Sequence, residues 1–289
     1  MAVKIGKQRI DISGRALVTG GSSGLGKAFA RALAGRGCSL TLVARNQQRL
    51  EQTRQEVMSE FPGVDVEVIS ADLGTDDGIR VVAQRLEDRT DPITVFVNNA
   101  GHGLHHKLAT TDVDPLIRTI DVMVTAPVVL GAYAAAAMKD RGRGIIVNVA
   151  SISGLVAMGL YSAVKSLMGT WSDSLAIELH GSGVHVMTLL PGWVRTDLHA
   201  RAHITTSNIP DVLWLTPEQV VIPALNAIER GKHRFIPTAR YKVIGALASY
   251  APRSAVNAVT AAINRSRTRA QESAAQRETN VHSASRVSK

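Results

Sequence analysis

Short runs of apolar residues alternate with amphipathic helical stretches through the first 240 residues of the chain. The apolar runs predict seven strands: RALVTG (15–20), SLTLVAR (39–45), VEVISADL (66–73), ITVFVNNAG (93–101), GIIVNVAS (144–151), VHVMTLLPG (184–192) and RFIPT (234–238). Because these runs are continuous rather than alternating, they are typical of strands buried on both faces. The alternation with helices predicts an α/β fold with a doubly wound parallel sheet of about seven strands and helices on both faces. Ligands of such sheets bind at the carboxyl ends of the strands.

Two segments depart from this rhythm. Residues 193–215 form a long connection with two Trp and no clear period, and loops of that length are uncommon unless they are functional. After about residue 264 the chain is polar and rich in Ser and Arg, as in a frayed helix or a flexible tail. We therefore expect one dinucleotide-binding domain over residues 1–240, an amphipathic helical extension over 241–263, and a basic tail over 264–289.

Composition and charge exclude several classes of protein. Apolar residues make up 45% of the chain, which excludes disorder over most of its length. The formal net charge is +9, but residues 240–289 hold nine basic and two acidic side chains, so the remainder is nearly balanced. No aromatic residue accompanies the basic ones after Tyr250, and no nucleic-acid motif is present, so we expect no nucleic-acid partner.

The single cysteine and the apolar runs bear on location. Cys38 cannot form an internal disulfide, which fits a reducing compartment, and we interpret it as a buried structural thiol. The first 14 residues lack the features of a secretory signal. The longest apolar runs, such as 243–251, fall short of the roughly 18 residues that a spanning helix needs. The sequence therefore predicts a cytoplasmic protein without a transmembrane segment.

A glycine-rich turn follows the first predicted strand. In LVTGGSSGLGKAFA (17–30), Gly20, Gly24 and Gly26 lie between the strand and a helix. Glycines let the backbone approach a pyrophosphate closely, and the helix N-terminus supplies N–H donors. The order strand, turn and helix predicts a Rossmann-type dinucleotide site.

The end of the second predicted strand indicates which dinucleotide binds. An acidic residue there would bond the ribose 2′-hydroxyl of NAD, but Ala44 holds this place and Arg45 follows it. A guanidinium pairs well with phosphate oxygens, so Arg45 favours NADP(H), although a solvated arginine is the alternative.

The glycine spacing T-G-x-x-x-G-x-G, from Thr19 to Gly26, resembles the short-chain dehydrogenase/reductase family. Further segments follow in the family's order over about residues 10–240: ADL (71–73), NNAG (98–101), Ser151, YSAVK (161–165) and PGWVRT (191–196). The resemblance implies that Asp72 lies near the adenine amino group and that Thr196 holds the nicotinamide carboxamide. The full set of cofactor contacts that it implies is Thr19, Gly20, Ser22, Ser23, Gly24, Leu25, Gly26, Arg45, Asp72, Leu73, Asn98, Ala100, Gly101, Tyr161, Lys165, Pro191, Gly192, Val194 and Thr196.

The same resemblance makes Ser151, Tyr161 and Lys165 the catalytic residues. Tyr161 and Lys165 are four positions apart, so they share one face of a helix. A free tyrosine has a pKa near ~10, and a neighbouring ammonium lowers the pKa of a phenol, so we expect Lys165 to lower that of Tyr161. Ser151 would position the substrate oxygen while Tyr161 donates or accepts its proton.

Two departures from the family pattern stand out. Ser151 and Tyr161 are ten residues apart, closer than in many members, and Ser153 is the reserve candidate for the role of Ser151. Met123 occupies the position of a helix Asn whose kinked backbone holds a relay water in the family. Its side chain cannot hydrogen-bond as an amide does, but its backbone carbonyl could still bind the water. The alternatives are an active enzyme with an altered relay or impaired, repurposed chemistry.

Substrate and partners are the least determined features. His102, His105 and His106 follow the fourth strand as solvated loop residues or as a polar lining to the substrate pocket, and no metal is expected. Residues 193–215 resemble a mobile lid in the family, and their apolar content favours a lipophilic ketone or alcohol such as a steroid, a 3-oxoacyl chain or a polyketide-like ketone. The equal alternative is that these side chains only pack the lid onto the body of the protein. Candidate substrate residues are His102, Trp193 and Trp214.

The sequence predicts an NADPH-dependent carbonyl reductase or alcohol dehydrogenase. The alternative is a catalytically impaired regulatory or interaction protein that binds NADP(H) on the same fold. Residues 241–263 could dock on a partner subunit or lie at a membrane surface, and the resemblance favours a homodimer or homotetramer.

Overall fold

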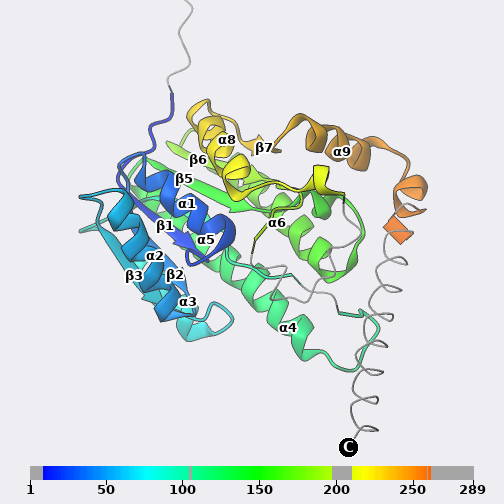
Figure 1. The fold of residues 1–289 in the computed structure, drawn as a ribbon, viewed down its shortest axis with the longest axis horizontal. Helices are drawn as coiled ribbons and strands as arrows, with labels where there is room; N and C mark the ends of the chain where they lie inside the picture. The colour runs from blue at the N-terminus through cyan, green and yellow to red at the C-terminus, as the bar shows by residue number, and fades with distance from the viewer. Residues whose placement is uncertain (1–8, 104–105, 197–209, 259, 262–289) are drawn as a thin grey trace, which may run out of the picture.

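Seven parallel strands form one continuous sheet in the computed structural model, which describes residues 9–103, 106–196, 210–258 and 260–261 (Figure 1). The strand order is β3-β2-β1-β4-β5-β6-β7. The strands are β1 (Arg15–Thr19), β2 (Ser39–Ala44), β3 (Val66–Ser70), β4 (Ile93–Asn98), β5 (Gly144–Val149), β6 (Val184–Leu189) and β7 (Arg234–Phe235). The predicted fold class is confirmed, and the order reverses between β1 and β4, where this architecture places its ligands.

Each strand ends earlier than its apolar run. The run at 93–101, for example, gives a strand only to Asn98, and the run at 66–73 gives one only to Ser70. The residues that follow leave the sheet as loops at its carboxyl edge. Hydrophobicity alone cannot show this, because these loop residues are also apolar or small.

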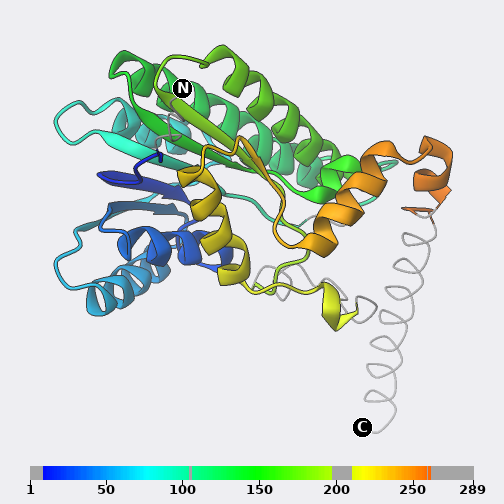
Figure 2. The ribbon, with the colours of Figure 1, turned by 90° about the horizontal axis from the view of Figure 1, so that it is seen from above.

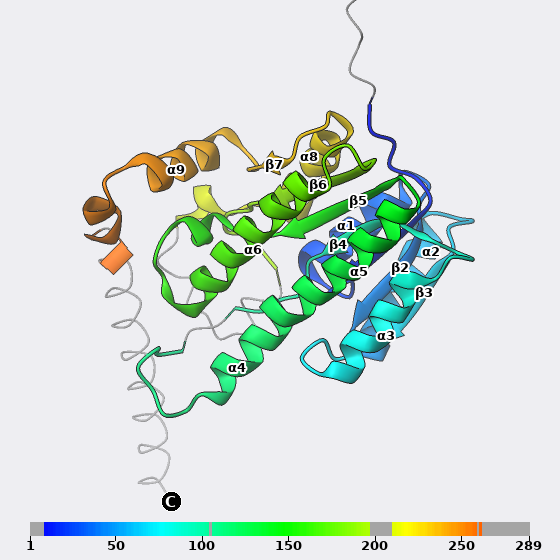
Figure 3. The ribbon, with the colours of Figure 1, turned by 180° about the vertical axis from the view of Figure 1, so that it is seen from behind.

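Helices cover both faces of the sheet (Figures 2 and 3). One layer consists of α1 (Gly24–Ala34), α2 (Gln47–Glu60) and α8 (Pro217–Glu229), whose buried residues pack with those of β1 and β2. The other layer consists of α3 (Asp76–Glu87), α4 (Asp114–Ile120), α5 (Ala126–Asp140) and α6 (Gly159–Glu178). Adjacent strand residues serve opposite layers, since Val18 packs in the first core and Leu17 in the second.

The helical stretch Asp114–Asp140 is long and apolar enough to cross a membrane by length and composition alone, and among the described residues no other helix meets that test. The sequence analysis did not expect such a stretch. Part of its apolar surface packs on the sheet, because Ala126, Leu130, Ala134 and Met138 are buried in the second core. The core helix of a soluble protein passes the same test.

A polar row crosses the sheet and fixes α6 against it. The strand register aligns four residues of β4 to β7: Asn98, Asn148, Thr188 and Arg234. The Nδ2 of Asn148 donates to Oγ of Ser172 on α6 at 3.0 Å, and Oγ1 of Thr188 donates to the same atom at 2.8 Å. Because buried polar groups need partners, these bonds favour one axial position of α6. That helix carries Tyr161 and Lys165.

The chain continues beyond β7 as α9 (Ala239–Tyr250), followed by a helical turn from residue 253. Pro252 accounts for the break between them, because a proline cannot continue the helix before it. In Figure 1, α9 lies at the opposite end of the molecule from α2 and β3. The basic tail expected at 264–289, His105, and residues 197–209 of the expected lid lie outside the described residues.

Candidate active site

A cavity of about 710 Å³ opens at the carboxyl edge of the sheet. It is lined by residues that follow each of the strands β1 to β6, and by residues of α9 and the turn after it. The cavity therefore lies where the strand order predicts a ligand site.

The glycine turn after β1 forms one end of this cavity. Gly20 and Gly24 have φ angles of +70° and +52°, which side chains rarely tolerate, and a Cβ on Gly26 would overlap the carbonyl of Gly20. Ser23 precedes α1 without capping it through its side chain, so its hydroxyl does not occupy the first N–H groups of the helix. A turn without side chains beside an uncapped helix N-terminus suits a pyrophosphate.

Thr19 lies beneath this turn rather than in the cavity wall. Its Oγ1 accepts bonds from the backbone N–H groups of Asn99 and Ala100, each at 2.9 Å. The Nδ2 of Asn99 in turn donates to the carbonyl of Thr19 at 2.8 Å. These bonds join the loops after β1 and β4, which face each other across the point where the strand order reverses.

The loops after β2 and β3 form the second part of the cavity. Arg45, Asn46 and Arg49 line it from the start of α2, and Asp72 and Leu73 line it from the loop after β3. Asn46 caps α2 by accepting a bond from the backbone N–H of Arg49 at 2.8 Å. The second arginine was not among the predicted site residues, although its position one turn after Arg45 could have indicated it.

Arg118 of α4 fixes the carboxylate of Asp72. Its Nη2 donates to both carboxylate oxygens, at 2.5 and 2.6 Å, and its Nη1 donates to the carbonyl of Gly74 at 3.2 Å. Burial acts to raise the pKa of Asp72, but the bonds from Arg118 and Gly74 outweigh it and lower the pKa. Arg118, which the sequence analysis missed, thus joins α4 to the loop expected to contact adenine.

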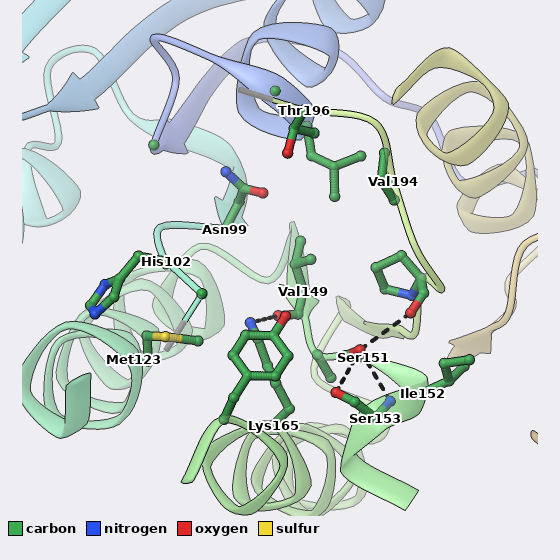
Figure 4. Close-up of a pocket in the computed structure, with 18 of the residues that line it drawn as sticks. Asn99, His102, Met123, Val149, Ser151, Ile152, Ser153, Lys165, Val194 and Thr196 are labelled. Atoms are coloured by element: carbon green, nitrogen blue, oxygen red, sulfur yellow. Dashed lines mark hydrogen bonds between the residues drawn. The ribbon is translucent and has the colours of Figure 1, made fainter. Parts of the chain in front are cut away.

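The predicted catalytic residues Ser151, Tyr161 and Lys165 all line the cavity, and Figure 4 shows Ser151 and Lys165 within it. Ser151 follows β5 and is buried, and its Oγ accepts bonds from the N–H of Ser153 at 3.1 Å and the hydroxyl of Ser153 at 2.9 Å. The Tyr161 side chain lines the same cavity, close enough to Ser151 for that serine to affect the pKa of the phenol. The Nζ of Lys165 donates to the carbonyl of Val149 at 2.8 Å. Ser153, the reserve candidate, therefore orients Ser151, and the short spacing between Ser151 and Tyr161 does not prevent their contact.

We expected Lys165 to lower the pKa of Tyr161, but in this structure the pKa of Tyr161 is raised. Burial raises the pKa of Tyr161 to about 12, and the hydrogen bond with Ser151 offsets this only in part. Burial also lowers the pKa of Lys165 to about 8. Although its Nζ lies only 5.8 Å from the centre of the Tyr161 ring, Lys165 loses its charge at a lower pH than the phenol does. No ammonium then remains to favour the phenolate.

Met123 lies in a π-helical segment, Asp121–Thr125, between α4 and α5. The N–H of Ala126 bonds the carbonyl of Asp121, five residues back. Pro127 has no N–H, so the carbonyl of Met123 cannot receive the usual bond from four residues ahead. The side chain of Met123 is 2% exposed and lines the cavity. The irregular backbone expected at this position is therefore present, with methionine in place of asparagine.

His102 is the only one of the three loop histidines that the structure places in the cavity wall, since His105 is not described. Its Nε2 lies 3.1 Å from Oγ1 of Thr119, and Figure 4 shows it beside Met123. Burial and the nearby charges of Arg45 and Arg118 lower the pKa of His102. His106 instead bonds the carbonyl of Asp112 at 3.0 Å.

The structure brings most of the predicted site residues together. In addition to the catalytic residues, those that line the cavity are Gly20, Ser22, Ser23, Gly24, Leu25, Arg45, Asp72, Leu73, Ala100, Gly101, His102, Pro191, Gly192, Trp193, Val194 and Thr196. Thr19 and Gly26 support the glycine turn from below.

Two predicted residues lie elsewhere. Asn98 points to the helical layer, where its Nδ2 donates to the carbonyl of Pro127 at 2.8 Å, and Asn99 lines the cavity in its place. Trp214, a candidate substrate residue, is not among the described residues that line the cavity, and its ring lies 5.4 Å from the guanidinium of Arg195. In both cases the strand register or loop path decides which neighbouring residue faces the cavity.

Comparison with known proteins agrees with this geometry. The family model for the short chain dehydrogenase matches residues 15–206. A very-long-chain 3-oxoacyl-CoA reductase of Anas platyrhynchos is 32% identical over 194 residues, which are 63% of this chain and 60% of that protein. The very-long-chain 3-oxoacyl-CoA reductase-B of Danio rerio is 32% identical over 220 residues, 74% of this chain and 68% of that protein. The chain thus spans about two thirds or less of the length of these relatives.

The similarity to solved structures covers a larger share of both chains than the similarity to these two relatives. A short-chain dehydrogenase from Sphingobium yanoikuyae in complex with NADPH has a TM-score of 0.74 and 32% identity, covering 80% of this chain and 91% of that one. The bulky-bulky ketone specific alcohol dehydrogenase from Comamonas testosteroni has a TM-score of 0.70 and 30% identity, covering 80% and 90%. From the family match, the glycine turn and the fold, we conclude that the chain belongs to the short chain dehydrogenase family.

Proposed function

We propose that this protein is an NADPH-dependent oxidoreductase, a carbonyl reductase or alcohol dehydrogenase, that acts on a lipophilic ketone or secondary alcohol. The observation that carries the proposal is the convergence of Ser151, Tyr161 and Lys165 on a cavity that also contains the glycine turn and Arg45. The relatives named as reductases and the NADPH complex of the Sphingobium yanoikuyae enzyme support it.

The residues present fit a dinucleotide. The glycine turn and the N-terminus of α1 would hold the pyrophosphate, and Arg45 and Arg49 would face a 2′-phosphate. When bound, the reduced nicotinamide supplies a hydride to the carbonyl carbon of the substrate. The preference for NADPH over NADH depends on Arg45, because a guanidinium gains its charge-assisted bonds only with the phosphorylated ribose.

Side chains of this protein would then bind the substrate oxygen and give it a proton. The Ser151 hydroxyl, oriented by Ser153, would donate a hydrogen bond to the substrate oxygen. Tyr161 would give that oxygen its proton, since its raised pKa keeps the phenol protonated at neutral pH. The carbonyl of Met123, which lacks its usual helical donor, is the acceptor we propose for a water that returns the proton towards Lys165.

The apolar walls of the cavity and the relatives together favour a lipophilic substrate. Ile152, Val156, Met158 and Trp193 line the cavity beside Ser151. Two relatives are named for bulky or very long substrates. We therefore propose a steroid, a 3-oxoacyl chain or a polyketide-like ketone as the class of substrate.

The test measures oxidation of NADPH, as the loss of its absorbance, in the presence of a panel of these ketones. The same assay is run in parallel with NADH. We expect turnover with NADPH that Tyr161→Phe abolishes and that Tyr250→Phe, a change at an 88% exposed residue, leaves intact. Tight NADPH binding without turnover of any ketone, and without oxidation of the corresponding alcohols with NADP⁺, would contradict the proposal. It would favour instead a binding protein that kept the fold.

We also propose that the protein is a homo-oligomer. Several large apolar side chains on the layer formed by α4, α5 and α6 are exposed: Ile117, Ile120, Tyr133, Leu167 and Ile177. A second copy of the chain would cover this surface, since exposed apolar patches commonly mark interfaces.

A further inference from the structure

The chain after β7 forms a wall of the cavity. Eight residues between 244 and 260 line it: Ile244, Gly245, Leu247, Ala248, Ala251, Ala255, Val256 and Thr260. The sequence left open that residues 241–263 dock on a partner subunit or lie at a membrane surface. The described part of this segment also lines the chain's own cavity, and four of the eight side chains are no larger than alanine.

This wall stands on the substrate side of the catalytic residues. α9 contacts the 3-10 helix η2 (Ile152–Leu155), which follows Ser151 directly. A Cβ on Gly245 would lie 3.6 Å from Cδ1 of Leu155 and 3.0 Å from Cδ1 of Ile236, so the absence of a side chain there permits the close approach. α9 lies at the opposite end of the molecule from α2 and β3, where the adenosine is expected, so α9 borders the part of the cavity away from the expected adenosine site (Figure 1).

The position of α9 is fixed at its first turn. Tyr241 is fully buried, and its hydroxyl donates to the carbonyl of Leu213 and accepts from the N–H of Trp193 at 3.0 Å. A Cβ on Gly192 would overlap the Tyr241 ring. The phenol therefore joins α9 to both described ends of the 193–215 segment, which also pair with each other through the bridge between Val194 and Leu215.

The backbone before α9 is strained. Thr238 has φ +64° and ψ 150°, a region that is essentially restricted to glycine, and it is the only described residue other than glycine with positive φ. Its hydroxyl is buried without a hydrogen-bond partner. Such a conformation persists only where the surrounding structure imposes it. The direction of α9 is thus set by its contacts with the cavity walls and not by local preference.

We propose that the cavity-lining residues of α9 and of the turn after it limit the size of the substrate, with Ala248 and Ala251 as specificity-determining residues. Their small side chains leave room in the cavity beside α9 for the bulky end of a lipophilic ketone. This inference rests on the proposed function, because it takes the cavity beside Ser151 as the substrate site.

The test enlarges one side chain of the wall. Ala248→Phe is compared with Ala246→Phe, a matched change on the exposed side of the same helix that does not line the cavity. For a homologous series of 2-alkanones and for a steroid ketone, kcat/KM and the dissociation constant are measured, the latter by intrinsic tryptophan fluorescence. Unchanged NADPH affinity shows that each variant is folded.

We expect Ala248→Phe to lower kcat/KM for the longest alkanones and the steroid by about tenfold or more, and to leave the shortest within about twofold. Ala246→Phe should match the unaltered protein throughout. Equal effects of Ala248→Phe on short and long ketones, or equal effects of both variants, would overturn the inference.

The dissociation constants separate this inference from the proposed function. Size-dependent binding that Ala248→Phe abolishes, without turnover in any variant, would support the wall and contradict the reductase. Turnover in the unaltered protein, with a loss of kcat/KM in Ala248→Phe that is the same for short and long ketones, would support the reductase and contradict the wall.

Discussion

Lys165 is the residue whose charge should set the pH dependence of reduction. Burial lowers its pKa to about 8, whereas the pKa of Tyr161 is raised to about 12, so the phenol stays protonated throughout the working range. We expect kcat/KM for ketone reduction to fall as the pH rises through about 8. A profile that stays flat to about pH 10 would contradict this assignment. In Lys165→Arg the guanidinium stays charged, and this limb of the profile should disappear even if the rate is low.

Thermal unfolding measured over the same pH range distinguishes this limb from loss of structure. The pKa of Lys165 is about 8 in the native protein and near its ordinary 10.5 in the unfolded chain. Between these values the unfolded state binds more protons, so the contribution of Lys165 to the free energy of unfolding rises with pH. Its effects on activity and on stability therefore have opposite signs.

Arg45 should decide the choice of dinucleotide. Arg45→Ala removes charge-assisted bonds to a 2′-phosphate, and we expect kcat/KM for NADPH to fall roughly 10- to 100-fold while that for NADH is unchanged. Arg54→Ala, on the helix α2 that follows Arg45 but outside the cavity, is the control. Equal losses with both dinucleotides would show that Arg45 acts on the fold and not on the phosphate.

For individual residues, the sequence predicted which side chains form the site better than it predicted their pKa values. The glycine turn and the positions of Ser151, Tyr161 and Lys165 follow from local spacing. The pKa values do not, because they depend on how deeply the folded chain buries each group. Likewise, whether Asn98 or Asn99 faces the cavity depends on the alternation of side chains at the end of β4, which a run of apolar residues does not reveal.

Among the secondary-structure elements, α9 depends on Tyr241. Tyr241→Phe leaves the carbonyl of Leu213 and the N–H of Trp193 without their shared partner. We expect a loss of about 1–3 kcal/mol in the free energy of unfolding and a severalfold higher KM for lipophilic ketones. Tyr250→Phe on the same helix should change neither. An unchanged KM in Tyr241→Phe, measured with the ketone that binds best, would mean that the hydroxyl does not position the wall.

The apolar periodicity predicted the strands and the main helices, but it did not predict the π-helical segment or the role of α9. The first arises from Pro127, whose missing N–H interrupts the bonding of an otherwise regular helix. The second is a matter of tertiary packing, because a helix of small apolar and basic residues has the same sequence whether it lines its own cavity or covers another subunit or a membrane.

For the molecule as a whole, the exposed apolar layer predicts self-association. Ile117 of α4 is 52% exposed and Ile177 of α6 is 77% exposed. We expect a dimer or tetramer in sedimentation velocity, and dissociation when both are changed to Asp, since burying unpaired charges opposes association. Val81→Asp, an exposed change on α3, should leave the assembly intact. A monomer at micromolar concentration in the unaltered protein would refute this expectation.

The wall after β7 also has a consequence for how the protein matures during synthesis. A ribosome makes the glycine turn, Ser151, Tyr161 and Lys165 well before it reaches Ala248 and Val256, so a nascent chain can hold every catalytic group while its cavity still lacks one side. Loss of the chain beyond residue 240 through proteolysis would return the finished protein to that state. If the wall limits substrate size as proposed, such a fragment would bind dinucleotide but would no longer distinguish substrates by size, although all of its catalytic groups are encoded far earlier in the chain.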